Sequence, residues 1–335
     1  MKLVASLLAF AAALAGVGAH AQTPAPIVIK FSHVVAADTP KGKAAERFKQ
    51  LAEKATGGRV RIDVYPNSQL YKDKEELEAL QLGAVQMLAP SLAKFGPLGV
   101  REFEVFDLPY IFPNKEALYR VTEGPIGHRL LKKLEAKGIT GLAFWHNGFK
   151  VMSANKPLHT PADFKGLKMR IQSSKVLDAQ MRALGAIPQA LVFSEVNQAL
   201  RSGVVDGTET PPSNFYTQRT HELQRYLTLS NHGYLGYAVI VNKKFWDGLP
   251  AEIRAALQGA MTEATRFGNA NAQKENEEAL EAIRKSGKTA VHVLSEQEKA
   301  EWRKALLPVH KEMESRIGKE LIVEVYREAN AASSR

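Results

Sequence analysis

The sequence contains no cysteine among its 335 residues. This absence excludes a disulfide framework, a thiolate metal site and a cysteine nucleophile. The glycine-rich signatures G-x-G-x-x-G and G-x-x-x-x-G-K-[ST], which cradle nucleotide phosphates, are also missing. So are the zinc-protease pattern H-E-x-x-H and the serine elbow G-x-S-x-G. We therefore expect no cofactor, no metal and no catalytic residues, and we predict that the protein is not an enzyme.

Long apolar runs are absent everywhere except at the N-terminus. Lys2 precedes an apolar run over residues 3–17, and Ala19-His20-Ala21 follows as an A-x-A cleavage site. This order predicts a secretory signal peptide that is cleaved after Ala21. No later segment approaches the ~18 apolar residues that a membrane span requires. We expect a soluble exported protein. The periplasm is the expected location, and free secretion is the alternative.

Charge of one sign is not concentrated in any run. The chain has 45 Lys and Arg against 35 Asp and Glu, which gives a formal net charge of +10. Acids and bases alternate closely, as in the segment KDKEE at residues 72–76. A nucleic-acid-binding protein would gather its basic residues on one face or in one stretch. We therefore expect no nucleic-acid partner.

The remaining pattern is that of an α/β protein of about two domains. Val60, Ile62 and Val64 alternate with polar residues over 59–65, which predicts a strand, and apolar residues at helical spacing predict a helix over 40–56. Asp73 with Glu76, and Ser295 with Glu298, have the spacing of helix capping boxes.

One helical pattern runs from Pro250 to about Ser286. An unbroken helix of that length would extend roughly 55 Å, which exceeds the diameter of a small domain. The sequence leaves two alternatives open: either the helix breaks near 269–271, or it spans two domains.

Residues 163–214 carry four motifs in order. They are FKGLKMR at 164–170, ALGAIP at 183–188, FSEVNQAL at 193–200 and GVVDGTETP at 203–211. At this spacing they resemble the signature region of the DctP-type substrate-binding proteins of TRAP transporters. IKFSH at 29–33, YPNSQL at 65–70 and FDLPY at 106–110 resemble that family too. The similarity covers nearly the whole chain after the signal peptide.

The resemblance implies a two-domain periplasmic binding protein of the Venus-flytrap type, with hinge strands and a long domain-spanning helix. We expect domain I to comprise residues 22–147 plus about 236–270, and domain II to comprise 148–235 plus about 271–335. The implied ligand is a small organic acid. The implied partners are the membrane subunits of a TRAP transporter, one DctQ-like and one DctM-like. We expect the protein itself to be a monomer.

The resemblance also implies ligand-binding residues. Arg170 matches the family arginine that grips the substrate carboxylate, and a guanidinium fork fits the two carboxylate oxygens. Lys150 occupies a position where sialic-acid-binding relatives carry a second arginine, and Phe193 matches an aromatic residue that packs on the ligand. Thr210 stands where the family usually has asparagine, so it loses the two amide donors. Glu209 is expected to support a cation rather than to touch an anion.

Further candidates follow from strand ends, where loops line the clefts of open α/β sheets. Ser91 and Lys94 are candidates for a second carboxylate. His33, Asn214 and Tyr237 are weaker candidates on the same grounds.

Taken together, the sequence predicts a protein that captures a C4-dicarboxylate such as succinate, malate or fumarate and delivers it to the membrane subunits. One alternative keeps the class but changes the ligand to a monocarboxylate, an aromatic acid or a sugar acid. Two others are a sensory input module and a secreted enzyme that acts on small acids.

Overall fold

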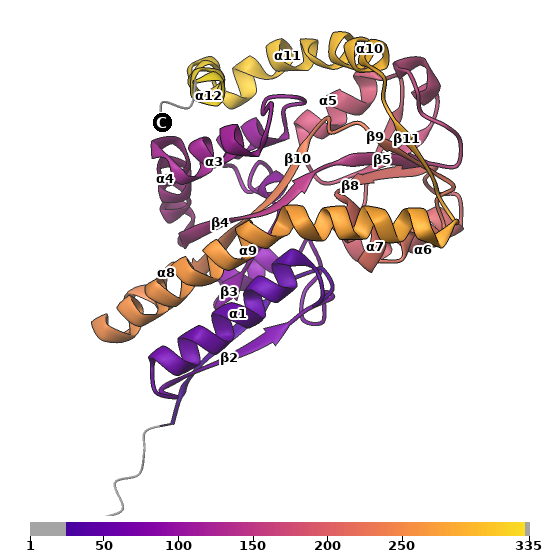
Figure 1. The fold of residues 1–335 in the computed structure, drawn as a ribbon. Coiled ribbons are helices and arrows are strands. Elements are labelled where there is room, and N and C mark those ends of the chain that lie inside the picture. Colours follow the sequence, from indigo (N-terminus) through magenta and orange to yellow (C-terminus); the bar gives the residue numbers. More distant parts are fainter. Residues whose placement is uncertain (1–24, 332–335) are drawn as a thin grey trace, which may run out of the picture.

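The computed structural model describes residues 25–331 and contains two mixed β-sheets (Figure 1). The predicted signal peptide and its cleavage after Ala21 lie outside the described residues. The first sheet has the order β2 (Val60–Tyr65), β1 (Ile27–Ser32), β3 (Met87–Leu88), β10 (Tyr234–Asn242) and β4 (Ile139–Phe149). The second has the order β11 (Ala290–Val293), β9 (Tyr226–Leu229), β5 (Val151–Ala154), β8 (Gly207–Thr210), β6 (Lys168–Ile171) and β7 (Ile187–Ala190).

Helices cover both sheets, and the fold is the two-domain α/β arrangement that the sequence predicts.

No helix in the described part of the chain is long and apolar enough to cross a membrane. The helices are α1 (Pro40–Ala55), α2 (Glu76–Gln81), α3 (Lys115–Glu123), α4 (Pro125–Lys133), α5 (Lys175–Ala183), α6 (Val196–Arg201), α7 (Pro212–Thr217), α8 (Lys243–Asp247), α9 (Ala251–Ser286), α10 (Glu296–Leu306), α11 (Pro308–Ile317) and α12 (Lys319–Asn330).

Local sequence explains most of these elements. Strand β2 buries Val60 and Ile62 and pairs in parallel with β1, as the alternation predicts. Helix α1 begins after Thr39, whose hydroxyl accepts a hydrogen bond from the Gly42 N–H at 3.1 Å. At the start of α10 the predicted capping box of Ser295 and Glu298 is present.

The predicted capping box of Asp73 and Glu76 is wrong. Helix α2 begins only at Glu76, and no side chain caps it. Both carboxylates instead form ion pairs with the buried Lys94. A buried ammonium needs nearby anions more than a helix end needs a cap, because an unpaired buried charge is the costlier defect.

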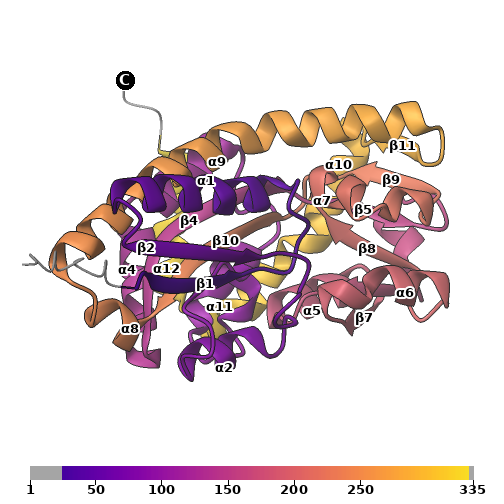
Figure 2. The same cartoon turned by 90° about the horizontal axis from the view of Figure 1, so that it is seen from below.

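Helix α9 is continuous over 36 residues, so the long helix spans two domains and does not break. Figures 1 and 2 show it passing along α1 and then beside α7. Its first half buries Leu257 and Met261 in the core of the first sheet, and Ile283 near its end packs with the second. At its middle, Asn269 Oδ1 accepts from the His146 N–H at 2.9 Å, while its Nδ2 donates to the Phe144 carbonyl at 3.2 Å. These bonds fasten the helix to β4 at residue 269, where the sequence left a break of the helix as one alternative.

The chain crosses between the sheets at two further places. Only Lys150 separates β4 of the first sheet from β5 of the second, and residues 230–233 separate β9 from β10. The two crossings lie side by side, because the Lys150 N–H donates to the Gly233 carbonyl at 2.8 Å. They correspond to the predicted hinge strands.

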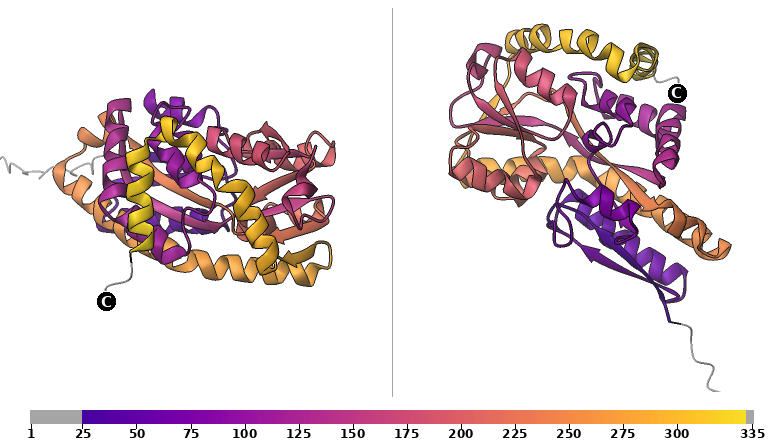
Figure 3. Two further views of the ribbon diagram at one scale, coloured as in Figure 1. Left: turned by 90° about the horizontal axis from the view of Figure 1, so that it is seen from above. Right: turned by 180° about the vertical axis from the view of Figure 1, so that it is seen from behind.

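The packing of the C-terminal helices concerns the boundary between the two expected domains. The boundaries themselves remain a prediction. Figure 3 shows α10 to α12 running across one side of the molecule from the second sheet toward the first. Met313 and Val325, on α11 and α12, belong to the apolar cluster that covers the first sheet. This packing favours assigning α11 and α12 to domain I instead of domain II.

Candidate ligand-binding site

A small cavity of about 20 Å³ lies between the two sheets, beside the crossing at Lys150. That volume is room for roughly one water molecule. In both sheets, the carboxyl ends of parallel strands point toward it: β1 and β3 from one side, β6, β7 and β8 from the other. Eight of the nine predicted ligand residues line the cavity: Ser91, Lys94, Lys150, Arg170, Phe193, Thr210, Asn214 and Tyr237.

Arg170 is a buried cation without a carboxylate partner. It lies on β6 with 4% of its surface exposed, and its Nε and Nη2 donate to the Leu191 carbonyl at 3.1 and 2.9 Å. Among residues 25–331 no carboxylate oxygen lies within 4.0 Å of its guanidinium nitrogens. Burial lowers the pKa of Arg170 below its ordinary value, although Asp73 and Glu209 oppose this. The group stays cationic, since an arginine is not deprotonated in proteins.

Lys41 is a second buried cation of the same kind, and sequence reasoning missed it. It lies in the first turn of α1 with 2% exposure, and it lines the cavity. Its Nζ donates to the Ala89 carbonyl at 3.0 Å and sits 3.8 Å from the ring centroid of Tyr237. Burial lowers the pKa of Lys41 to about 7. One feature of the sequence could have identified Lys41 as a site residue: it is a lysine at a helix N-terminus, where the helix dipole disfavours a cation.

Lys150, by contrast, is neutralised inside the protein. Its Nζ donates to Glu209 Oε1 at 2.7 Å, and both side chains are almost fully buried. The other oxygen of Glu209 accepts from Gln180 Nε2 at 3.2 Å and lies 2.8 Å from His232 Nε2. Burial alone would raise the pKa of Glu209, but Lys150 and His232 hold it well below its usual range. This geometry fits the expected supporting role of Glu209.

Lys94 is also paired. Asp73 and Glu76 both contact its ammonium, and all three groups are largely buried. Burial alone would lower the pKa of Lys94, but the two carboxylates raise it. Asp73 also accepts the backbone N–H of Phe193 and thereby joins the two sides of the cavity. The Phe193 ring lies 5.8 Å from the Arg170 guanidinium, at the limit of a cation–π contact.

Neutral polar groups complete the lining. Tyr237 donates its hydroxyl to Asn147 Oδ1 at 3.3 Å and accepts from Asn214 Nδ2 at 3.4 Å. Asn214 Oδ1 is buried and has no partner in the described structure. The hydroxyls of Ser91 and Thr210 likewise make no side-chain hydrogen bond with residues 25–331, although both residues are buried. The two hydroxyls are free to donate to oxygens of a ligand, and the Asn214 amide oxygen is free to accept from a ligand hydroxyl.

His33 is the predicted site residue that the structure does not bring to the cavity. It is fully buried, and neither ring nitrogen has a hydrogen-bond partner among the described residues. Burial, with Lys41 nearby, lowers the pKa of His33 to about 3, so the ring is neutral. Its neighbours Val34 and Val35 line the cavity in its place, as does Gln172, which sequence reasoning also missed.

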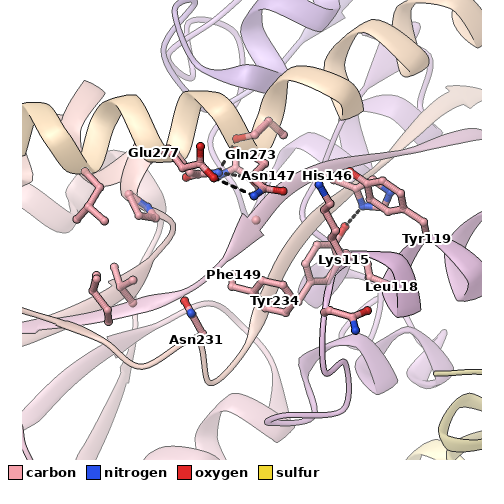
Figure 4. A pocket seen from close by; sticks show the side chains of 18 of the residues that line it. Lys115, Leu118, Tyr119, His146, Asn147, Phe149, Asn231, Tyr234, Gln273 and Glu277 are labelled. Atoms are coloured by element: carbon pink, nitrogen blue, oxygen red, sulfur yellow. Dashed lines mark hydrogen bonds between the residues drawn. The ribbon is translucent and has the colours of Figure 1, made fainter. Parts of the chain in front are cut away.

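A much larger cavity of about 530 Å³ lies on another side of the crossing strands. Figure 4 shows Phe149 and Tyr234 in its wall, with Gln273 and Glu277 contributed by α9. Its charged lining residues, Lys115 among them, are exposed to solvent. Exposed charges are screened and bind ions weakly. The small cavity with its buried cations is therefore the better candidate site for an anion.

Comparison with known proteins agrees with this geometry. The sequence profile of the family described as bacterial extracellular solute-binding protein, family 7, matches residues 31–316. A Rhodobacter capsulatus protein, described as the C4-dicarboxylate-binding periplasmic protein DctP, is 68% identical over 300 residues, which cover 90% of each chain.

Two crystal structures of TRAP periplasmic solute-binding proteins extend the likeness to the fold. One, from Sulfurospirillum deleyianum with bound succinate, has a TM-score of 0.87 at 45% identity and covers 89% of this chain and 98% of its own. The other, from Pseudomonas aeruginosa with bound L-malate, has a TM-score of 0.84 at 44% identity and covers 86% and 100%. The chain therefore belongs to family 7 of the bacterial extracellular solute-binding proteins, the DctP family, and is a TRAP-type solute-binding protein.

Proposed function

We propose that the protein binds a C4-dicarboxylate such as succinate, malate or fumarate in the small cavity. The observation that carries this proposal is that two buried cations there, Arg170 and Lys41, lack a carboxylate partner among residues 25–331. Lys94 and Lys150 have partners within the protein. Two unpaired positive charges match the two carboxylates of a dianion, because a buried charge is stable only when it is paired.

The roles of the two cations differ. Arg170 already uses Nε and Nη2 on the Leu191 carbonyl, and its remaining N–H donors are available for one carboxylate. Lys41, with the Ser91 hydroxyl near the end of β3, meets the other. Lys150, which the sequence suggested as a ligand contact, instead keeps Glu209 ionised and in place.

The two cations come from different sides of the molecule. Lys41 belongs to α1, which packs on the first sheet, and Arg170 belongs to β6 of the second. A ligand that pairs with both therefore holds the two sides together. The cavity, at about 20 Å³, is too small to hold a four-carbon acid, so binding requires the sides to separate about the two strand crossings. The ligand then favours closure through its higher affinity for the closed state.

The location and partners are part of the same proposal. The N-terminal signal sequence supports export to the periplasm, and the name of the Rhodobacter capsulatus relative agrees with that location. We propose that the closed, loaded protein delivers its ligand to DctQ-like and DctM-like membrane subunits. No catalytic step is proposed.

Unused hydroxyls in the cavity favour a hydroxylated acid as the preferred member of this class. Ser91 and Thr210 have no side-chain hydrogen bond within residues 25–331, and Asn214 Oδ1 has no partner. The hydroxyl group of malate would donate to one of these oxygens. A higher affinity for malate than for succinate would support this ranking.

Calorimetric titration of the mature protein, unfolded and refolded to remove bound ligand, tests the proposal. The panel comprises succinate, malate, fumarate, the mono-amide of succinate, lactate and a sugar acid. We expect the diacids to bind and the mono-amide to bind at least about 100-fold more weakly, since it leaves one buried cation unpaired. The Arg170→Ala variant should lose at least about 100-fold in affinity for the diacids.

Arg182→Ala is the matched control, because Arg182 is an exposed arginine on α5 whose only ion pair within residues 25–331 is with Asp178. It should bind like the unmodified protein. Equal affinity for succinate and its mono-amide would refute the dicarboxylate assignment. Tight binding of diacids by Arg170→Ala, with circular dichroism showing an intact fold, would refute the site.

A further inference from the structure

Two histidines and a glutamate meet on the surface of the second sheet, away from the ligand cavity. His159 lies in the segment after β5, His292 lies on the edge strand β11, and Glu298 lies in the first turn of α10. His159 Nδ1 is 3.0 Å from His292 Nε2 and 3.0 Å from Glu298 Oε1, and His292 Nε2 is 3.1 Å from that same oxygen. Three atoms that can donate lone pairs therefore form a nearly equilateral triangle.

The size of this triangle fits a metal ion. Imidazole nitrogens and carboxylate oxygens bind Zn²⁺ and similar cations at about 2.0–2.2 Å. Adjacent ligands of an octahedral ion at about 2.1 Å are then about 3.0 Å apart, and those of a tetrahedral ion are about 3.4 Å apart. The observed edges match the first value and approach the second. A mixed set of imidazole and carboxylate ligands suits Zn²⁺, Ni²⁺ or Co²⁺ better than Mg²⁺ or Ca²⁺.

Other bonds already hold the three ligands in place. The His159 N–H donates to Asp163 Oδ2 at 2.9 Å, and the His159 carbonyl accepts from Trp302 Nε1 at 2.9 Å. Glu298 Oε2 accepts from the Ser295 N–H at 2.7 Å in the capping box, which leaves Oε1 directed at the histidines. Such supporting bonds orient the ligands of metal sites before the ion arrives.

Electrostatics gives a second reason for a positive charge at the centre. Two imidazole nitrogens and a carboxylate oxygen at about 3 Å repel one another unless a proton or a cation lies between them. The site is also accessible, since 45% of the His159 side chain and 33% of the His292 side chain are exposed.

We propose that His159, His292 and Glu298 form a binding site for one divalent cation of the zinc type, with water completing its coordination. The ion would join three separate segments: the loop after β5, the edge strand β11 and the start of α10. In a chain without cysteine, such a link would stabilise the edge of the second sheet. The inference is independent of the ligand in the cleft, because none of the three residues lines that cavity.

The test uses mature protein without a histidine tag, stripped with a chelator and titrated with Zn²⁺ by calorimetry. We expect one ion per chain, a rise in Tm of about 4 °C at a hundredfold excess over Kd, and no effect of Mg²⁺. Co²⁺ in place of Zn²⁺ should give a visible absorption band, which reports direct coordination.

His159→Ala and His292→Ala should each weaken Zn²⁺ binding at least tenfold and abolish the cobalt band. His128→Ala, which alters an exposed histidine on α4, should change neither. Unchanged affinity for succinate in all three variants shows that the fold and the cleft are intact. The proposal is overturned if Zn²⁺ binds no more tightly than about 1 mM, or if binding persists equally in His159→Ala and His292→Ala.

Discussion

The pKa of Lys41, which burial lowers to about 7, makes ligand affinity depend on pH in the neutral range. A carboxylate binds the ammonium form of lysine and gains little from the neutral amine. As the pH rises through about 7, the free protein loses the Lys41 proton, and binding must then recover it. Affinity for a C4-dicarboxylate should therefore fall on the alkaline side, although the ligand itself stays fully ionised there.

The magnitude follows from linkage for a single proton. With a pKa of about 7, the apparent Kd should rise about 25-fold between roughly pH 6.5 and pH 8.5, or about 1.9 kcal/mol. The stability of the ligand-free protein should change in the opposite direction. Between about pH 7 and 10.5 the unfolded chain holds the lysine proton and the folded chain does not, so this group makes stability increase with pH.

The assay is calorimetric titration with succinate at several pH values across that range. Lys41→Arg is the decisive variant, since its guanidinium stays charged and should flatten the dependence. Asp107 is the competing group, because burial raises its pKa to about 7 as well and its ionisation would also repel an anion. Asp107→Asn should leave the slope unchanged. An affinity constant within about threefold across the range, or the same slope in Lys41→Arg, would refute the reasoning.

Two further predictions concern stability. Glu209→Gln should lower the free energy of unfolding by about 3–5 kcal/mol in urea denaturation, because Lys150 is left as an unpaired buried charge; a loss below about 1 kcal/mol would contradict this pairing. Two glycines of α9 form a matched pair. A Cβ at Gly268 would lie 2.9 Å from Ala44 Cβ, so Gly268→Ala should destabilise by about 1–3 kcal/mol. Gly259 has open space, so Gly259→Ala should stabilise by about 0.5–1 kcal/mol. Thermal denaturation measures both, and equal Tm shifts would refute the argument about α1 packing.

Features that depend on nearby residues were accessible from the sequence. The family, the two-domain α/β fold and the solute-binding class are confirmed, and they rest on ordered motifs and on periodicity. The capping box of Ser295 and Glu298 involves residues three positions apart, and it is present. The four motifs around Arg170 are similarly compact, which is why the sequence placed this residue in a binding role that the geometry supports.

Features that depend on distant partners were not accessible. Lys41 becomes a site residue only because β3 and Tyr237, far along the chain, surround it. Asp73 does not cap a helix, because its carboxylate forms an ion pair with Lys94. His159 and His292 are 133 positions apart, so no spacing rule could pair them.

The interior place of β10 in the first sheet has a consequence for synthesis. This strand comes from residues 234–242, yet it fills the gap between β3 and β4, which end at residues 88 and 149. A growing chain of about 150 residues therefore holds β3 and β4 without the strand that joins them, and both unpaired edges invite association with other chains. Stable folding must wait until some two thirds of the polypeptide exist. Fragments that stop before β10 should aggregate, whereas a circular permutant opened in a surface loop keeps every strand and should fold.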